Sequence, residues 1–342
     1  MRRCGRLRTL VAMRTPLCDV LGIDVPIICA PFGPWDSVDV AAAVCAAGGL
    51  GSLGTAVRPV GELQEQWQRL RRRTDRPFAV NHQPRPFDEA AFAATLAHRP
   101  AAISYHMGDP GELVDRAHDV GIRWIQQVMD VDQACQALDR GADVIVAQGG
   151  EAGGHSGFVS TMALVPQVVD VAGTTPVVAA GGIADGRGLA AALALGAQGV
   201  AMGTRFLAST EMRIDEAWKR MLVEAASRDA QHDELLDLLL PPYNRPHHPA
   251  VGRMLPTAFS RRWSGRPEEL SARAGELGPA IVSAVLAGRG HEYVPFAGQS
   301  VGLVDDVLPA AEIVRRTCAQ AAAILGELAQ QRGRTRVGPA SS

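Results

Sequence analysis

Three features of the sequence predict an α/β fold of the (β/α)8, or TIM-barrel, class with a helical lid insertion. Eight short apolar runs alternate with helical patterns between residues 25 and 202. The runs are apolar throughout instead of alternating with polar residues, which is typical of parallel strands buried on both faces. Glycine precedes several runs, at Gly121, Gly141, Gly173 and Gly196, where the preceding helix would end. Eight such units in a row favour a closed barrel over an open doubly wound sheet.

The expected strands and helices alternate in a regular order. We predict strands at residues 25–30, 50–53, 78–80, 101–104, 123–128, 143–147, 176–180 and 199–202. Helices are expected at residues 38–47, 60–73, 88–97, 112–119, 131–140, 162–172, 187–195 and 308–328. The last of these helices resumes the barrel order after an interruption.

That interruption begins after residue 209. Residues 210–290 are expected to form a helical lid, with helices at 211–237 and 267–286 on either side of a proline-rich loop, and with breaks at Gly275 and Gly278. A lid closes a site and excludes water. We therefore expect residues 14–209 and 291–330 to form the barrel domain, and residues 1–13 and 331–342 to be disordered.

Composition and charge exclude several classes of protein. A chain of 342 residues with a net charge of −2 gives no electrostatic case for binding nucleic acid or an anionic membrane. No apolar run approaches the roughly 20 residues that span a bilayer. The six cysteines are scattered without a CxxC pair, which fits a reducing compartment and disfavours a structural zinc site. We expect a cytoplasmic protein without a metal, and a homodimer is compatible with the sequence.

Two glycine-containing turns follow consecutive predicted strands. Gly181 and Gly182 come directly after the strand at 176–180, and Gly203 and Thr204 follow the strand at 199–202. Backbone N–H groups at such turns bind anions, especially phosphates. Many β/α barrels build a phosphate site after their seventh and eighth strands. The two turns therefore predict a ligand that carries a phosphate.

A histidine lies in a third glycine-rich segment. His155 is surrounded by Gly153, Gly154 and Gly157, in a predicted loop directly after the strand at 143–147. An imidazole at the end of a barrel strand is a candidate acid, base or hydrogen-bond donor. We predict that His155 contacts the substrate.

Other polar and aromatic residues leave their roles open. His82 and His106 follow predicted strands, where each can line a pocket or support a loop. Glu151 can act as a base or order its own loop, and Trp35 can line the pocket or fill the barrel mouth. The single lysine of the chain, Lys219, lies outside the predicted strands. The sequence therefore excludes enzymes that form a Schiff base on a lysine of a barrel strand, which include most aldolases and pyridoxal-phosphate enzymes of this fold.

Several long motifs resemble the nitronate monooxygenase family, formerly called 2-nitropropane dioxygenases. They are AQGGEAGGHSG at 147–157, AAGGIADGRGLAAALALGAQGVAMGTRFL at 179–207 and AGQSVGLV at 297–304, together with the opening LGIDVPIICAPF. The similarity runs almost continuously from residue 17 to 203 and resumes near the C-terminal helix. Related flavin-dependent enoyl-acyl carrier protein reductases share these motifs.

The resemblance implies an FMN-dependent TIM barrel that oxidises alkyl nitronates with O₂ to a carbonyl compound and nitrite. A first alternative is an NAD(P)H-dependent FMN reductase that acts on an enoyl thioester or a quinone. A second is a non-redox barrel that binds a sugar phosphate through the same glycine turns. The expected partners are thus a small-molecule substrate and O₂.

The resemblance also implies roles for individual residues. Gly181, Gly182, Gly203 and Thr204 would hold the FMN phosphate, and His155 would act on the substrate near flavin N5. The other positions matched to the FMN site are Ala30, Pro31 and Phe32 beside the ring, Asn81 at its polar edge, Gly154 close to it, and Gln127, Gln148, Met202 and Gln299 in the surrounding wall.

Two positions depart from the family pattern. Phe32 stands where methionine is common, and the PWDS that follows after Gly33 is unusual, which puts the substrate in doubt. Gln127 occupies the place where some relatives have a lysine near the flavin. Without that cation, the anionic reduced flavin would be less stabilised.

Overall fold

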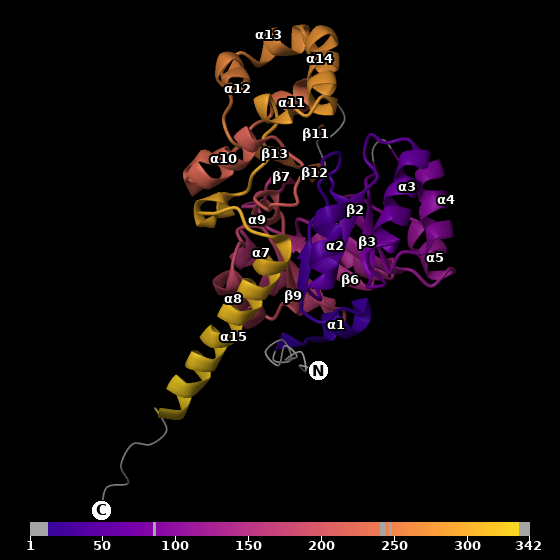
Figure 1. Cartoon of the computed structure of the whole chain (residues 1–342), viewed down its shortest axis with the longest axis vertical. Coiled ribbons are helices and arrows are strands. Elements are labelled where there is room, and N and C mark those ends of the chain that lie inside the picture. Colours follow the sequence, from indigo (N-terminus) through magenta and orange to yellow (C-terminus); the bar gives the residue numbers. More distant parts are fainter. Residues whose placement is uncertain (1–12, 85–86, 240–243, 246–247, 335–342) are drawn as a thin grey trace, which may run out of the picture.

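Eight parallel strands form a closed barrel in this protein. The structure, a computed structural model, describes residues 13–84, 87–239, 244–245 and 248–334. The strand order is β1-β9-β8-β6-β5-β4-β3-β2, and a parallel bridge between Ile28 and Leu50 joins the two edges. The predicted TIM barrel is confirmed (Figure 1).

The barrel elements match the predicted ones with small shifts at their ends. Its strands are β1 (Ile27–Cys29), β2 (Gly51–Gly54), β3 (Phe78–His82), β4 (Ala102–His106), β5 (Arg123–Val128), β6 (Val144–Gln148), β8 (Val177–Ala180) and β9 (Gly199–Met202). Its helices are α2 (Val38–Ala46), α3 (Val60–Arg71), α4 (Glu89–His98), α5 (Leu113–His118), α6 (Val131–Asp139), α7 (Thr161–Ala172), α8 (Gly186–Ala194) and α15 (Ala310–Arg334).

A short helix that the sequence analysis did not predict, α1 (Pro16–Leu21), packs against the interior of the barrel. Its Leu17, Cys18 and Leu21 are buried in one cluster with inward-facing strand residues such as Ile125 and Val178. Inward-facing side chains of parallel strands fill a barrel and make it a packed core. The amino-terminal end of the barrel is therefore filled, which leaves the opposite end for a ligand.

The C-terminal helix α15 packs against α8 and α2 and takes the place of the eighth barrel helix. The contact with α8 is close because Gly186 has no side chain: a Cβ there would lie 2.4 Å from the Ala321 backbone nitrogen. The Gly186 N–H donates to Gln320 Oε1 at 2.8 Å. A helix far along the chain thus completes the barrel, as expected.

The described residues between 210 and 290 lie at the carboxyl-terminal end of the barrel and are called the insertion here (Figure 1). After the short helix α9 (Thr204–Leu207) its elements are α10 (Glu216–Glu224), η2 (Ser227–Asp229), β10 (Gln231–His232), α11 (Leu235–Leu239), β11 (Asn244–Arg245), β12 (His248–Pro249), β13 (Val251–Met254), α12 (Ala258–Trp263), α13 (Pro267–Ala272) and α14 (Ala274–Leu286). The turns η3 (Gly290–Glu292) and η4 (Gln299–Leu303) lead back to α15.

The insertion is not wholly helical, which corrects the sequence prediction. β10, β13 and β7 (Gly154–Ser156) form a small antiparallel sheet, and the expected helix at 211–237 is divided among four elements. The second helix breaks at Arg273, and Gly275 and Gly278 lie inside α14. Strands of two to four residues depend on their partners and carry no periodic signal of their own.

Most of the two ends that were expected to be disordered, residues 1–12 and 335–342, lie outside the described residues. Of the remainder, Met13 is buried and α15 continues to Arg334. Within the described ranges, no helix combines the length and the apolar character that crossing a bilayer requires.

Candidate active site

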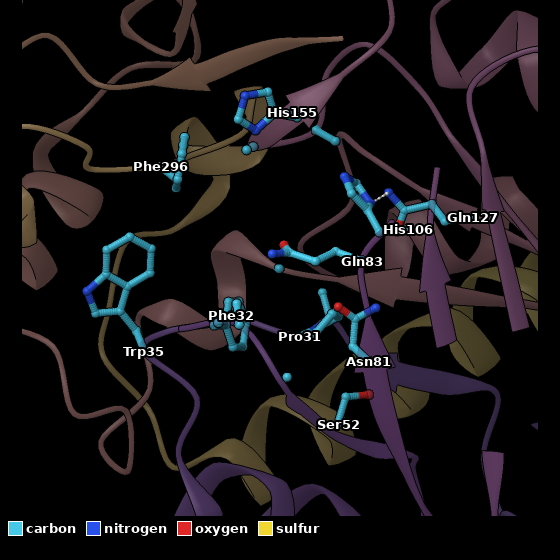
Figure 2. Close-up of a pocket in the computed structure, with 18 of the residues that line it drawn as sticks. Pro31, Phe32, Trp35, Ser52, Asn81, Gln83, His106, Gln127, His155 and Phe296 are labelled. Atoms are coloured by element: carbon cyan, nitrogen blue, oxygen red, sulfur yellow. Dashed lines mark hydrogen bonds between the residues drawn. The ribbon is translucent and has the colours of Figure 1, made fainter. Parts of the chain in front are cut away.

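A cavity of about 560 Å³ lies between the carboxyl-terminal ends of the barrel strands and the insertion. Barrel strands, the loops that follow them and helix α14 of the insertion all contribute to its wall. Figure 2 shows polar side chains from the barrel, among them Asn81, Gln127 and His106, turned toward this space. This end of a β/α barrel is where such enzymes bind their ligands.

Most of the residues predicted to form the site line this one cavity. They are Ala30, Pro31, Phe32, Asn81, Gln127, Gln148, Gly154, His155, Gly181, Gly182, Gly203 and Thr204. Met202 and Gln299 are not among its lining residues. Met202 is buried in the core between barrel and helices, while Gln299 bonds through its backbone N–H to Glu151 O at 2.8 Å and the adjacent Ser300 lines the cavity.

The two glycine turns form a cradle that suits an anion. Gly181 and Gly182 have φ of +97° and +73°, a conformation that favours glycine. A Cβ at Gly203 would be in ordinary van der Waals contact with the side chains of Ala30 and Phe32, at 3.8 Å and 3.9 Å, so the backbone is not closely covered by other atoms here. The backbone N–H groups of these three glycines donate no hydrogen bond to any residue in the described ranges. The cradle therefore offers free donors to a phosphate.

Amide side chains line the cavity next to this cradle. Gln148 Oε1 is buried, and no residue in the described part of the chain forms a hydrogen bond with it. A buried acceptor left unsatisfied costs free energy, so a ligand that donates to it is favoured. Asn81 donates through Nδ2 to Ser104 Oγ at 3.0 Å, which fixes the amide at the cavity wall. A flavin ring, which has both donors and acceptors on its polar edge, fits these groups.

His155 lies on the short strand β7, not in a loop as predicted. β7 pairs with β13 of the insertion, with His155 opposite Gly252. Its Nε2 is 2.8 Å from Oδ1 of Asp237, whose side chain is 1% exposed. The other carboxylate oxygen of Asp237, Oδ2, is buried and has no hydrogen-bond partner among the residues that the structure describes. The insertion thus supplies a buried acidic partner for the histidine.

Sequence reasoning missed Asp237. It lies on α11 in the segment DELLDLLL, where acidic residues at helical spacing indicate a solvated face. Only the fold brings it to His155, which is 82 positions away in the chain. No signal in a single sequence could have identified this pair.

His106 and Gln127 form a second polar pair in the cavity (Figure 2). Gln127 Nε2 and His106 Nδ1 are 2.7 Å apart. Burial, together with a smaller effect of the nearby His155, lowers the pKa of His106 to about 4. His106 is therefore neutral near pH 7. Gln127, at the position where some relatives are expected to have a lysine, here holds a neutral imidazole.

Of the residues whose roles the sequence left open, some line the cavity and others support the surrounding structure. His82 does not line this cavity; its Nε2 is 2.9 Å from Thr95 Oγ1, and burial lowers its pKa to about 4. Glu151 accepts hydrogen bonds from the backbone and the hydroxyl of Thr161, each at 2.8 Å, and so orders its loop. Trp35 lines the cavity and packs edge-on against Trp218 at 5.1 Å between ring centroids.

The unusual PWDS segment has a structural reason. Asp36 accepts the Phe32 backbone N–H at 2.7 Å and pairs with Arg58 at 3.3 Å. Burial raises the pKa of Asp36, while these two contacts oppose the rise. The buried carboxylate therefore fixes the loop after β1, which contributes Pro31, Phe32 and Trp35 to the cavity.

The chain is similar to known proteins over most of its length. The chain matches the nitronate monooxygenase family over residues 14–91 and 83–320. It is 36% identical to a nitronate monooxygenase of Metarhizium robertsii, with 87% of this chain and 91% of that protein covered. The solved structure of FabK from Thermotoga maritima superposes with a TM-score of 0.84 at 32% identity, covering 93% of this chain and 99% of that one.

A further relative has a different name. The chain is 38% identical to a 5-hydroxy-7a-methyl-1-oxo-octahydro-1H-indene-4-carboxyl-CoA dehydrogenase of Mycobacterium tuberculosis over 62% of its own length, and it spans 61% of that protein. The family match covers most of the barrel and of the insertion. The chain belongs to the nitronate monooxygenase family and is a flavin-dependent oxidoreductase of that family.

Proposed function

We propose that this protein uses FMN to oxidise alkyl nitronates with O₂ to a carbonyl compound and nitrite. The observation that carries the proposal is a single cavity that contains both the anion cradle and the His155–Asp237 pair. The cradle holds the cofactor, and the histidine acts on the substrate next to it. The similarity to the nitronate monooxygenase of Metarhizium robertsii supports this reaction.

In this proposal the cofactor site is built from the barrel. Gly181, Gly182, Gly203 and Thr204 bind the phosphate, while the loop at Pro31 and Phe32 lies against the ring. Asn81 and Gln148 bind the polar edge of the ring. FMN, when bound, supplies the redox chemistry that a protein side chain cannot.

The remaining polar groups position the substrate. Asp237 fixes the His155 ring through Nε2 at 2.8 Å, so the imidazole presents one orientation to the cavity. His155 then either orients the nitro group or takes a proton from the carbon next to it. Neutral His106, held by Gln127, adds a polar contact without adding charge. The insertion covers these groups and limits access of water.

The His155→Asn variant tests the role of the histidine. A base is needed only for a neutral nitroalkane, since a nitronate has already lost its proton. If His155 is the base, turnover of nitroethane falls about 100-fold to 10,000-fold while turnover of ethyl nitronate is retained. If His155 orients the substrate, both activities fall. Unchanged turnover of both compounds across pH would rule out any catalytic role.

A second candidate function is supported by the relative that is named as a CoA-ester dehydrogenase. In this alternative, the protein is an NAD(P)H-dependent FMN reductase acting on an enoyl thioester or a quinone. An anaerobic spectrum of the FMN-loaded protein separates the two. Prompt bleaching of the flavin band by NADH or NADPH favours the reductase. A band that ignores both nucleotides and changes with ethyl nitronate favours the monooxygenase.

A further inference from the structure

One wall of the cavity is made only of aliphatic side chains from helix α14. Ile281, Val282, Val285 and Leu286 all line the cavity. Ile281 and Val285 are four residues apart, and so are Val282 and Leu286. Residues at this spacing are neighbours on the helix surface, so the four side chains lie on one face of α14. No lysine or arginine occurs among the described lining residues. This wall offers neither hydrogen bonds nor positive charge.

The aliphatic wall runs from the interior to the surface. Ile281 is 1% exposed, whereas Val282 is 37% and Leu286 is 67% exposed. A side chain that lines the cavity and is also largely exposed lies where the cavity opens to solvent. Ile281 and Leu286 are five residues apart, which corresponds to about 7.5 Å along the helix axis. This is roughly the length of a chain of six methylene groups.

The barrel also contributes an exposed apolar residue to the lining of the cavity. Val57, in the loop after β2, lines the same cavity and is 64% exposed. Its φ is +57°, a left-handed conformation that is rare for a β-branched side chain. Strain of this kind persists where the surrounding structure holds it and is concentrated at ligand sites. Val57, Val282 and Leu286 together are named the apolar rim here.

Exposed apolar groups at a cavity entrance indicate a ligand that covers them. The polar groups lie deeper, at His155, Gln148 and the glycine cradle. On the basis of the proposed function, we infer that the substrate is amphiphilic. Its nitronate group reaches His155, and an unbranched or cyclic apolar group of about six carbons runs along α14 to the apolar rim. Small nitronates such as ethyl nitronate leave this wall uncovered.

A chain-length series on the FMN-loaded protein tests the inference. The value of kcat/KM for straight-chain 1-nitronates is expected to rise by about threefold for each added methylene from ethyl to hexyl, because each one becomes buried against α14. In the variant Leu286→Gln, the hexyl-to-ethyl ratio of kcat/KM is expected to fall at least about tenfold. Leu328→Gln is the matched control, since Leu328 is 52% exposed on α15 and does not line the cavity. A flat series, or an equal fall in the control, overturns the inference.

Binding of unreactive 1-alkanols, measured by isothermal titration calorimetry, separates this inference from the proposed function. If affinity rises with chain length and depends on Leu286 while no nitronate is oxidised, the aliphatic wall is a ligand site and the proposed reaction is wrong. If nitronates are oxidised without dependence on length in either assay, the proposed reaction holds and the wall is not a substrate site. Absence of both effects overturns both.

Discussion

The barrel and the insertion contribute two different surfaces to one cavity. The barrel strands and their loops supply amides, histidines and open glycine backbone, whereas α14 supplies only aliphatic side chains. Asp237 is the exception, because it crosses from the insertion to His155. In the proposed function this difference corresponds to two roles. The barrel residues bind the cofactor and act on the reacting group, and the residues of the insertion select the substrate. A family can then keep its chemistry while its substrate changes.

The strongest test of this division acts on the barrel alone. Gly203→Val places a branched side chain where the phosphate is proposed to bind. Its Cβ would meet Ala30 and Phe32 only at van der Waals distance, 3.8 Å and 3.9 Å. We expect the dissociation constant for FMN, measured by quenching of flavin fluorescence, to rise about 100-fold, or about 2.7 kcal/mol. Gly61→Val in α3 is the control, since a Cβ there meets nothing within 4 Å and the residue does not line the cavity. Unchanged affinity for FMN would remove Gly203 from the cofactor site.

The next test concerns Asp237, the acidic residue through which the insertion contacts His155. Asp237→Asn keeps the shape of the side chain but removes its charge, so His155 loses its buried anionic partner. We expect kcat to fall by about tenfold or more while the affinity for FMN is unchanged. The control is Asp233→Asn, because Asp233 caps α11 through the Leu235 N–H, a contact that asparagine can keep. A parallel loss of FMN affinity would indicate a structural role for Asp237 instead.

The two surfaces also differ in how far they could be predicted. All eight barrel strands were predicted because buried parallel strands are continuous apolar runs separated by helices of regular period. The insertion was predicted only as a region: the sheet of β7, β10 and β13 was missed, and so was Asp237. These features depend on contacts between segments distant in the sequence. Hydrophobic periodicity and residue propensity were therefore sufficient to predict the barrel strands, but they could not identify Asp237 as the partner of His155.

The glycines show the same limit within the barrel. AQGGEAGGHSG has four glycines in its two GG pairs, but they serve different purposes. A Cβ at Gly149 would lie 2.1 Å from Thr161 Oγ1, and one at Gly153 would lie 2.6 Å from the Gly298 backbone nitrogen, so these two are required by packing. Gly154, with φ of +72° and nothing within 4 Å, faces open space. The sequence identifies a glycine-rich site, but only the packing tells which glycines a ligand can approach.

The smallest expected effect concerns the stability of the barrel in acid. Burial lowers the pKa of His82 and of His106 to about 4, below the ordinary value of 6.5. In both cases the unfolded chain binds a proton more readily than the folded one. These two histidines therefore do not reduce the free energy of unfolding above pH 6.5, and they reduce it progressively as the pH falls from 6.5 toward 4. Each histidine contributes at most about 1.4 kcal/mol per pH unit in this window.

Urea unfolding of the protein without cofactor, repeated between pH 7 and pH 4.5, measures this loss. The variant His82→Asn can keep the contact of His82 Nδ1 with Thr55 Oγ1 but carries no titratable ring. We expect its free energy of unfolding to fall less steeply with pH than that of the native chain. His118→Asn is the control, because His118 is exposed at the surface and pairs with Asp143. If both variants follow the native curve, the acid sensitivity does not come from the buried barrel histidine. A reduced slope in His82→Asn alone would place the acid-labile part of the molecule in the barrel, the same region that is proposed to hold the cofactor.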